Sequence, residues 1–304
     1  MRIVTLLPSA TDLVLALGQG DNLVGISHSC DGPALLDGLP RLTSTSVPQG
    51  DSQVIDDYVR DHLETHSALY QLDLEGLEAA KPDVVLSQGL CEVCAVATGD
   101  VVEAVQGLSS RPQLVDLNPF RLEDIFDDLA KLGEVLGCAD HAAAVVQTLK
   151  LRVQRVAAIT KDLPRRRVAF LEWLMPLFNG GHWNPELVQL AGGEDLTGSL
   201  GQPSSTLSWE QLEAADAELL LVACCGYRVP RTREDLEALG REARWNQLRA
   251  VRDGQVFMAD GQAYFARPGP SVVEALERLA ATLHPDHFSA EPFERFAGAG
   301  AIAT

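Results

Sequence analysis

Residues 74–86 read LEGLEAAKPDVVL, and the pattern returns at residues 209–221 as WEQLEAADAELLL. In both copies a short helical pattern, with acidic residues and alanines at the same places, precedes an apolar run of strand length. A helix that leads into a buried strand twice in one chain is typical of an internal duplication. The sequence therefore predicts two related lobes, each built from strands and helices in alternation.

Apolar runs on either side of the two copies extend this pattern. Strands are expected at 3–7, 23–26, 84–86 and 113–115 in the first half, and at 167–171, 219–223 and 256–259 in the second. Helical patterns separate them, which is typical of α/β architecture with mainly parallel sheets. The predicted fold class is therefore α/β, with two Rossmann-like lobes joined by one long rigid helix.

This joining helix is expected to begin near Asp140, which can act as its N-cap. Apolar residues recur from there at helical spacing through Val156, and no glycine or proline interrupts the pattern before Pro164. Such a helix is a stiff spine rather than a flexible linker. The expected organisation is an N-terminal lobe at 1–120, the spine at 121–163, a C-terminal lobe at 164–285 and a loosely held tail at 286–304.

The chain has 304 residues, of which 46% are hydrophobic and 22% charged, so it can bury a core. Its 43 acidic and 24 basic residues leave a net charge of −19, which argues against nucleic acid or an anionic membrane surface as a partner. No apolar run is long enough to span a membrane. The first residues lead straight into a predicted strand without a secretory leader, so we expect a cytoplasmic protein, or a periplasmic one if the native start lies upstream.

Ligands of open α/β sheets bind beyond the carboxyl ends of the strands, so the loops at these ends define the candidate site. In two facing lobes they would line one cleft. The loops concerned lie at 87–94, 172–183, 224–228 and 260–270. They carry two of the four tryptophans and further aromatic residues among glycines. This composition suits a broad, flat, apolar ligand, although the same rings could instead close the core of a lobe.

Several short motifs follow one another along residues 1–284. They are LPSATD at 7–12, GISHSCD at 25–31, KPDVV at 81–85, GGHWNPE at 180–186, AGGE at 191–194 and RPGP at 267–270. In this order the chain resembles the cobalamin- and iron-chelate-binding proteins of ABC importers, and most of all their cobalamin-binding subgroup. The resemblance implies two lobes on a helical spine and a ligand held between them without covalent chemistry, hence no enzyme.

The resemblance and the loops at the strand ends together give a set of residues that we expect to bind cobalamin or a related corrinoid. The rings expected to sandwich the macrocycle are those of Trp173, Phe178, Trp183 and Tyr264. The side chains expected on its polar rim are those of His28, Asp31, Glu172 and Arg267. The other residues expected at the site are Ser9, Gln88, Cys91, Glu92, Gly181, His182, Cys225, Asp260 and Phe265.

The resemblance also implies one surface glutamate on each lobe that docks into a basic pocket of an ABC permease. Glu75 and Glu210 fall at these positions, and they are equivalent residues of the internal repeat. A structural explanation is equally open, because an acid in the first turn of a helix interacts favourably with the helix dipole. The expected partners are thus a corrinoid and a permease, with no nucleic acid and no insertion into a membrane.

Two groups of cysteines follow equivalent strands, Cys91 with Cys94 and Cys224 with Cys225. A Cys-x-x-Cys spacing is compatible with a redox dithiol, with half of a zinc or iron site, or with small residues that pack a loop. Facing pairs would favour metal contact, with Cys91, Cys94 and Cys225 as the candidate ligands. Two alternatives therefore stay open: an iron-chelate-binding protein, and a cytosolic metal or thiol protein that uses these cysteines.

Overall fold

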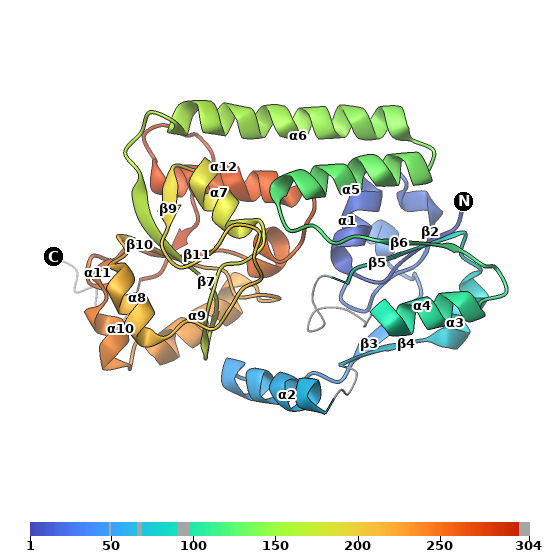
Figure 1. The fold of residues 1–304 in the computed structure, drawn as a ribbon, viewed down its shortest axis with the longest axis horizontal. Helices are drawn as coiled ribbons and strands as arrows, with labels where there is room; N and C mark the ends of the chain where they lie inside the picture. Colours follow the sequence, from blue (N-terminus) through green and yellow to red (C-terminus); the bar gives the residue numbers. More distant parts are fainter. Residues whose placement is uncertain (49, 66–68, 90–97, 298–304) are drawn as a thin grey trace. The chain divides into compact units, whose positions relative to one another are not determined.

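The structure is a computed structural model that describes residues 1–48, 50–65, 69–89 and 98–297. The chain divides into two compact units. The first comprises Met1–Gly50, Val54–Pro119 and Glu123–Gln147, and the second comprises Asp51–Gln53, Phe120–Leu122 and Thr148–Thr304. Each unit holds its own sheet with mainly parallel strands (Figure 1), which confirms the predicted α/β class.

The first unit is built on a parallel sheet with the strand order β2-β1-β5-β6. Its strands are β1 (Ile3–Thr5), β2 (Leu23–Gly25), β5 (Val84–Ser87) and β6 (Gln113–Asp116), as the sequence predicts. A separate antiparallel pair is formed by β3 (Thr43–Thr45) and β4 (Tyr70–Leu72). The helices of this part of the chain are α1 (Pro8–Ala16), η1 (Gly20–Asn22), η2 (Ala34–Leu36), α2 (Ser52–Glu64), α3 (Leu74–Ala80), α4 (Thr98–Gly107) and α5 (Leu122–Val135).

The second unit is built on a sheet with the order β12-β11-β10-β7-β8, in which β9 also pairs with β7. Its strands are β7 (Arg166–Leu174), β8 (Leu177–Asn179), β9 (Gly193–Asp195), β10 (Leu219–Val222), β11 (Val256–Met258) and β12 (Glu294–Arg295). Its helices are α7 (Asn184–Leu190), α8 (Trp209–Ala215), α9 (Val229–Leu239), α10 (Ala243–Gln247), α11 (Arg249–Arg252), the π-helical turn η3 (Gly261–Phe265) and α12 (Ser271–Leu283). β7, β10 and β11 are parallel neighbours, as expected.

The two copies of the sequence repeat have the same local structure. α3 and α8 are both 7 residues long, and each begins with a side chain that caps the helix, Asp73 in one copy and Ser208 in the other. Each ends at a left-handed residue, Lys81 with φ 45° and Asp216 with φ 43°, before the chain enters β5 or β10. Local capping and an apolar strand run are therefore enough to specify this motif twice.

The segment 172–183 is not the open loop that the sequence predicts. β7 continues through Leu174, a two-residue turn follows, and β8 pairs back antiparallel with Trp173 opposite Phe178. Residues of high β-propensity on both sides of a tight turn explain this hairpin. As a result, two aromatic residues of the predicted site form a cross-strand pair on a sheet rather than occupying a loop.

The tail is also more ordered than expected. β12 pairs antiparallel with β11, and Phe293 and Phe296 are only 4% and 9% exposed. The average composition of the tail does not reveal this, because two buried rings are enough to attach a short segment to a core. The expectation of a loose tail is therefore wrong for residues 293–296.

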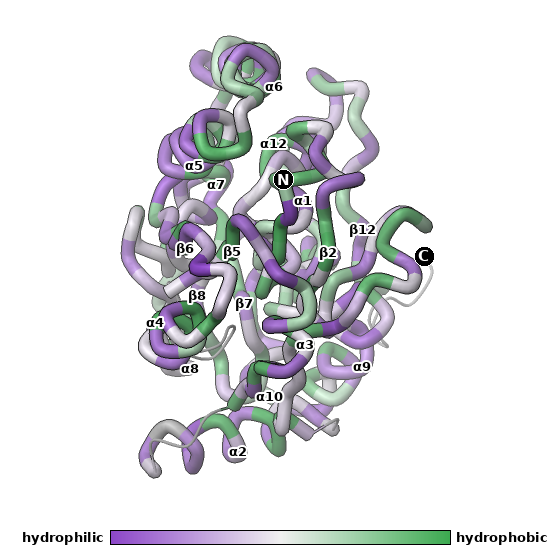
Figure 2. Tube along the Cα trace, turned by 90° about the vertical axis from the view of Figure 1, so that its right-hand side faces the viewer, coloured by the Kyte–Doolittle hydropathy of each residue, from purple (hydrophilic) through white to green (hydrophobic). Residues whose placement is uncertain are grey.

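The predicted spine is α6 (Ala139–Thr160), a helix of 22 residues that leads from the first unit into the second. Asp140 lies in its first turn rather than at its N-cap. α5, which precedes it, has hydrophobic residues along one side and hydrophilic ones along the other (Figure 2), with Ile125, Leu129 and Leu132 buried. No helix in the described part of the chain is both long and apolar enough to cross a membrane.

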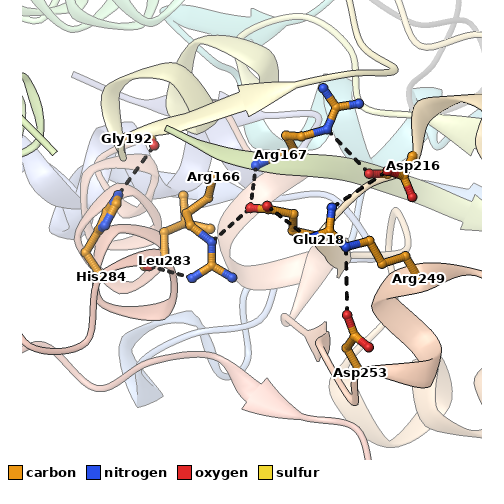
Figure 3. A network of polar contacts seen from close by, with 9 residues as sticks. All are labelled: Arg166, Arg167, Gly192, Asp216, Glu218, Arg249, Asp253, Leu283 and His284. Carbon is orange, nitrogen blue, oxygen red and sulfur yellow. Dashed lines mark hydrogen bonds and ion pairs between the residues drawn. The ribbon is translucent and has the colours of Figure 1, made fainter. Parts of the chain in front are cut away.

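A network of charges lies where β7 and β10 begin, at the opposite end of these strands from the predicted ligand loops (Figure 3). Glu218 accepts hydrogen bonds from the side chains of Arg166 and Arg249, both at 3.3 Å, and from the backbone N–H of Arg167 at 3.4 Å. Burial opposes ionisation, but these donors hold the pKa of Glu218 below its ordinary value. The network thus ties β7 to α11 through an ionised carboxylate.

Candidate ligand-binding site

Three of the predicted site segments meet at the carboxyl edge of the second sheet. Because β7, β10 and β11 are parallel neighbours, the segments that follow them leave the sheet at the same edge. The backbone N–H of Cys225 donates to the carbonyl of Glu172 at 2.9 Å, and that of Gln262 donates to the carbonyl of Tyr227 at 3.1 Å. The hairpin, the cysteine-containing loop and the turn after β11 are therefore direct neighbours.

These segments present aromatic rings that are only partly buried. Trp173 packs against Tyr227 with ring centroids 4.8 Å apart, and its Nε1–H donates to the carbonyl of Met175 at 3.0 Å. Phe178 and Tyr264 are also partly exposed. Rings whose orientation is already set can contact a ligand at little cost in conformational entropy.

Two other aromatic residues of the predicted site belong to the core of the second unit. Trp183 is 3% exposed and Phe265 is 1% exposed. Phe265 packs between Phe170 and Phe293, with ring centroids 5.0 Å and 5.6 Å away. Both residues thus lie beneath the surface of this unit.

Glu172, predicted on the polar rim, links the hairpin to the turn before α7. Its Oε1 accepts hydrogen bonds from the backbone N–H of Gly181 at 3.0 Å and from Nδ2 of Asn184 at 2.5 Å. Burial raises the pKa of Glu172, and these hydrogen bonds only partly counteract the effect. The carboxyl group therefore holds the turn that carries His182, which has a left-handed φ of 54°.

This turn carries polar atoms that are buried and have no partner among the described residues. They are Nε2 of His182, Nε1 of Trp183 and Oδ1 of Asn184. The His182 ring lies against Phe120, with centroids 5.5 Å apart, and burial lowers the pKa of His182. Since buried polar groups are nearly always hydrogen-bonded, the turn can accept a further polar group or a water molecule.

The remaining predicted residues of the second unit shape its backbone. At Gly181, a Cβ would lie 2.2 Å from the backbone nitrogen of Ser204, so only glycine fits there. Asp260 caps the turn after β11 by accepting a hydrogen bond from the N–H of Ala263 at 2.8 Å. Arg267 is 9% exposed and lies just before α12.

In the first unit, the predicted residue His28 lies in the loop after β2. Arg41 stabilises this loop by donating to the carbonyls of Ser27 at 3.1 Å and Cys30 at 2.6 Å. The His28 ring lies against Tyr70, with centroids 5.9 Å apart. Burial and, to a smaller extent, the charge of Arg41 lower the pKa of His28, which favours the neutral form of its imidazole.

The other predicted residues of the first unit lie around the carboxyl edge of its sheet. Ser9 is 5% exposed in the first turn of α1, and Gln88 is 9% exposed just after β5. Nε2 of Gln88 is buried and has no partner among the described residues. Asp31 is partly buried and follows Cys30. The predicted residues Cys91, Glu92 and Cys94 lie outside the described residues.

The predicted cysteine–metal site therefore stays a prediction. Cys224 is fully buried, and burial raises the pKa of its thiol. Cys225 is partly buried, and both are free thiols. Within the described ranges, no three histidine, cysteine or acidic side chains are grouped so that they could hold a metal ion. Since Cys91 and Cys94 fall outside those ranges, this observation leaves the hypothesis untested.

The two predicted docking glutamates have different surroundings. Glu75, in the first turn of α3, is exposed, and no ion pair involves it among the residues described. Glu210, in the first turn of α8, forms an ion pair with Arg244 at 2.8 Å. Arg244 also makes a bidentate contact with Glu213, with distances of 2.6 and 2.7 Å. The equivalent residues of the repeat thus differ in their electrostatic partners.

Sequence reasoning did not identify several residues that organise these groups. Thr43 and Tyr70 contact His28 from the antiparallel pair β3–β4, and Phe120 contacts His182 from a distant part of the chain. No local signal marks these three. Asn184 did carry one, because the following proline marks the start of a helix and therefore a residue in a turn.

Known proteins resemble this chain over most of its length. Residues 3–263 match the model of a family described as periplasmic binding proteins. An ABC transporter substrate-binding lipoprotein of Bacillus subtilis is 22% identical over 299 residues, covering 94% of this chain and 81% of that protein. A vitamin B12-binding protein of Photorhabdus laumondii is 24% identical over 292 residues, covering 93% of this chain and 88% of that protein.

Two solved structures illustrate the similarity in fold. A periplasmic heme-binding protein of Pseudomonas aeruginosa matches with a TM-score of 0.69 and 24% identity, covering 97% of this chain and 95% of the other. The periplasmic vitamin B12-binding protein of Vibrio cholerae matches with a TM-score of 0.66 and 21% identity, covering 93% and 96%. At these identities the solved structures establish the two-lobed fold alone.

The expectation of a cytoplasmic protein is wrong. The matching family model is one of periplasmic proteins, the Bacillus subtilis relative is a lipoprotein, and both solved relatives are periplasmic. The relatives are thus periplasmic proteins or lipoproteins.

Proposed function

The chain belongs to the periplasmic binding protein family, and on this premise we propose that it is the substrate-binding component of an ABC importer and binds cobalamin or a related corrinoid. The observation that carries the proposal is the group of partly buried rings at the carboxyl edge of the second sheet. Trp173 and Tyr227 lie in contact there, with Phe178 and Tyr264 on neighbouring segments. Flat ring surfaces of this kind suit a macrocycle rather than a small polar solute.

The charge of the chain favours a corrinoid over anionic ligands of similar size. With 43 acidic and 24 basic residues, the protein repels heme carboxylates and negatively charged iron chelates. A corrinoid instead carries neutral amide side chains around its ring. Nε2 of His182, which is buried and has no partner among the described residues, is suited to a hydrogen bond with such an amide.

Ligand titration tests the proposal. We expect cyanocobalamin and dicyanocobinamide to quench the fluorescence of the protein saturably, with hemin and ferric chelates binding at least about tenfold more weakly. If hemin or a ferric chelate bound more tightly than the corrinoids, the proposed ligand class would be wrong, although the family assignment would stand. Stoichiometric zinc or iron in protein purified without a chelating tag would instead support the cysteine-ligated alternative.

We also propose that the ligand is released unchanged, so that the protein is not an enzyme. The side chain of Glu172 contacts the turn that carries His182, and its Oε1 accepts hydrogen bonds from Gly181 and Asn184. This carboxyl group thus has a structural role in positioning the turn, which supports a binding protein rather than an enzyme.

Glu75 and Glu210 are proposed to contact the permease. Replacing either one with alanine should lower the ATPase stimulation that the ligand-loaded protein produces in proteoliposomes containing the cognate transporter. We expect the larger loss for Glu75, because Arg244 already pairs with Glu210 and competes with a basic pocket. Corrinoid affinity should not change. Glu237→Ala, at an exposed position on α9, is the matched control; wild-type stimulation by both variants would contradict the proposal.

A further inference from the structure

The imidazole of His28 is held at one of its two nitrogens. Its Nδ1 lies 2.7 Å from Oγ1 of Thr43, and the backbone N–H of His28 donates to the same oxygen at 3.0 Å. Thr43 is 5% exposed on β3, so this partner is fixed. Nε2, on the opposite edge of the ring, makes no hydrogen bond with any residue that the structure describes. The ring is therefore oriented, and among the described residues only one of its nitrogens has a partner.

The surrounding hydroxyl groups allow this nitrogen to present a lone pair. Oγ1 of Thr43 has one proton of its own to donate, and Oγ of Ser27 lies 3.0 Å away to accept it. Ser27 can in turn donate to Oγ of Ser29 at 3.1 Å. With the hydroxyls oriented in this direction, Oγ1 of Thr43 accepts a hydrogen bond from the N–H at Nδ1 of His28, and Nε2 of this tautomer carries no proton.

This arrangement is the one that histidine ligands of metals generally adopt. A ligating imidazole binds through one nitrogen, while the other donates a hydrogen bond that fixes the tautomer and the ring orientation. The Tyr70 ring, 5.9 Å from that of His28, further restricts the imidazole, and Arg41 stabilises the loop beneath it.

We propose that Nε2 of His28 is an axial ligand to the cobalt of the bound corrinoid, and that Thr43 is the residue that positions it. The inference rests on the proposed function and concerns residues of the first unit alone. The Nε2 lone pair forms the bond to Co(III), an axial water molecule leaves, and neither a proton nor an electron is transferred. The protein would therefore distinguish corrinoids whose cobalt carries an exchangeable axial ligand from corrinoids whose two axial ligands do not exchange.

Two cobinamides with different axial ligands test the proposal. Diaquacobinamide has exchangeable water on cobalt, whereas both positions of dicyanocobinamide are occupied by cyanide. We expect the wild-type protein to shift the visible spectrum of diaquacobinamide to that of an imidazole complex. His28→Ala should abolish the shift and weaken diaquacobinamide binding at least about tenfold, with dicyanocobinamide binding unchanged. Thr43→Val should reduce the shift while His28 remains present.

His287→Ala, which removes an exposed histidine of the second unit, is the matched control and should behave as wild type. A spectral shift that persists in His28→Ala would overturn the proposal. So would wild-type protein that binds both cobinamides without any shift, a result that leaves the corrinoid function intact. If wild-type protein binds neither cobinamide nor cyanocobalamin, the proposed function itself fails.

Discussion

Replacing Trp173 with alanine is expected to weaken cyanocobalamin binding by about 30-fold, the loss typical of a central aromatic contact. The indole is partly exposed, and its orientation is already set by the hydrogen bond to the carbonyl of Met175 and by contact with Tyr227. Replacing it removes ring surface that a flat ligand would cover. Because the indole is already ordered without ligand, its loss saves little conformational entropy on binding. Isothermal titration calorimetry with cyanocobalamin measures the change.

Two further variants separate loss of contact from loss of structure. Trp173→Phe retains most of the ring surface on the hairpin and should bind within about threefold of wild type. Trp209→Ala removes a partly buried tryptophan of α8, which packs on Arg244 at 5.7 Å, and should bind normally. A Trp173→Ala variant that melts like wild type and binds cyanocobalamin with wild-type affinity would exclude this ring from the site.

Replacing Glu172 with alanine is expected to lower the free energy of unfolding by about 3 kcal/mol. The change leaves the N–H of Gly181 and the amide of Asn184 without their acceptor in a buried region. Urea unfolding measures the loss. Glu194→Ala, at an exposed position on β9, is the matched control and should stay within about 0.5 kcal/mol of wild type. If both variants lowered the free energy of unfolding by a similar amount, the role of Glu172 in holding the turn at Gly181 and Asn184 would be contradicted.

The same carboxyl group predicts a dependence of stability on pH. Burial raises the pKa of Glu172 above its ordinary 4.5, so the folded chain keeps a proton that the unfolded chain has already released. The stability linked to this group is fully present below the ordinary pKa and is lost as the pH rises through the raised one. Glu172→Gln cannot titrate, so the stability of wild type relative to this variant should fall as the pH rises above 4.5. A difference that does not fall with rising pH would show that the carboxyl group is not perturbed.

Much of the fold could be predicted because its signals are local. A capping side chain, a few apolar residues at helical spacing and a left-handed C-terminal residue lie within one short segment, as at Asp73 to Lys81 and again at Ser208 to Asp216. The same holds for the buried strands and for α6, whose 22 residues contain no glycine or proline. Periodicity and capping act between neighbours in the chain, so a single sequence displays them.

The candidate site was predictable only in part, because a side chain's role depends on its distant partners. Trp173 and Trp183 both looked like ligand contacts in the sequence, yet one is partly exposed and the other is 3% exposed within the core. Glu172 looked like a rim carboxylate, and the fold uses it to hold Gly181 and Asn184. Nothing in the residues around these positions distinguishes the alternatives.

The amino-acid order alone therefore established a duplicated α/β chain and the segments from which a binding surface would be made. Tertiary structure decided which of those side chains face solvent, that the tail adds a strand to the second sheet, and that Thr43 orients His28. The physical reason is that strand pairing and burial join residues far apart in the chain, and their free energy depends on contacts that exist only once the whole unit has folded.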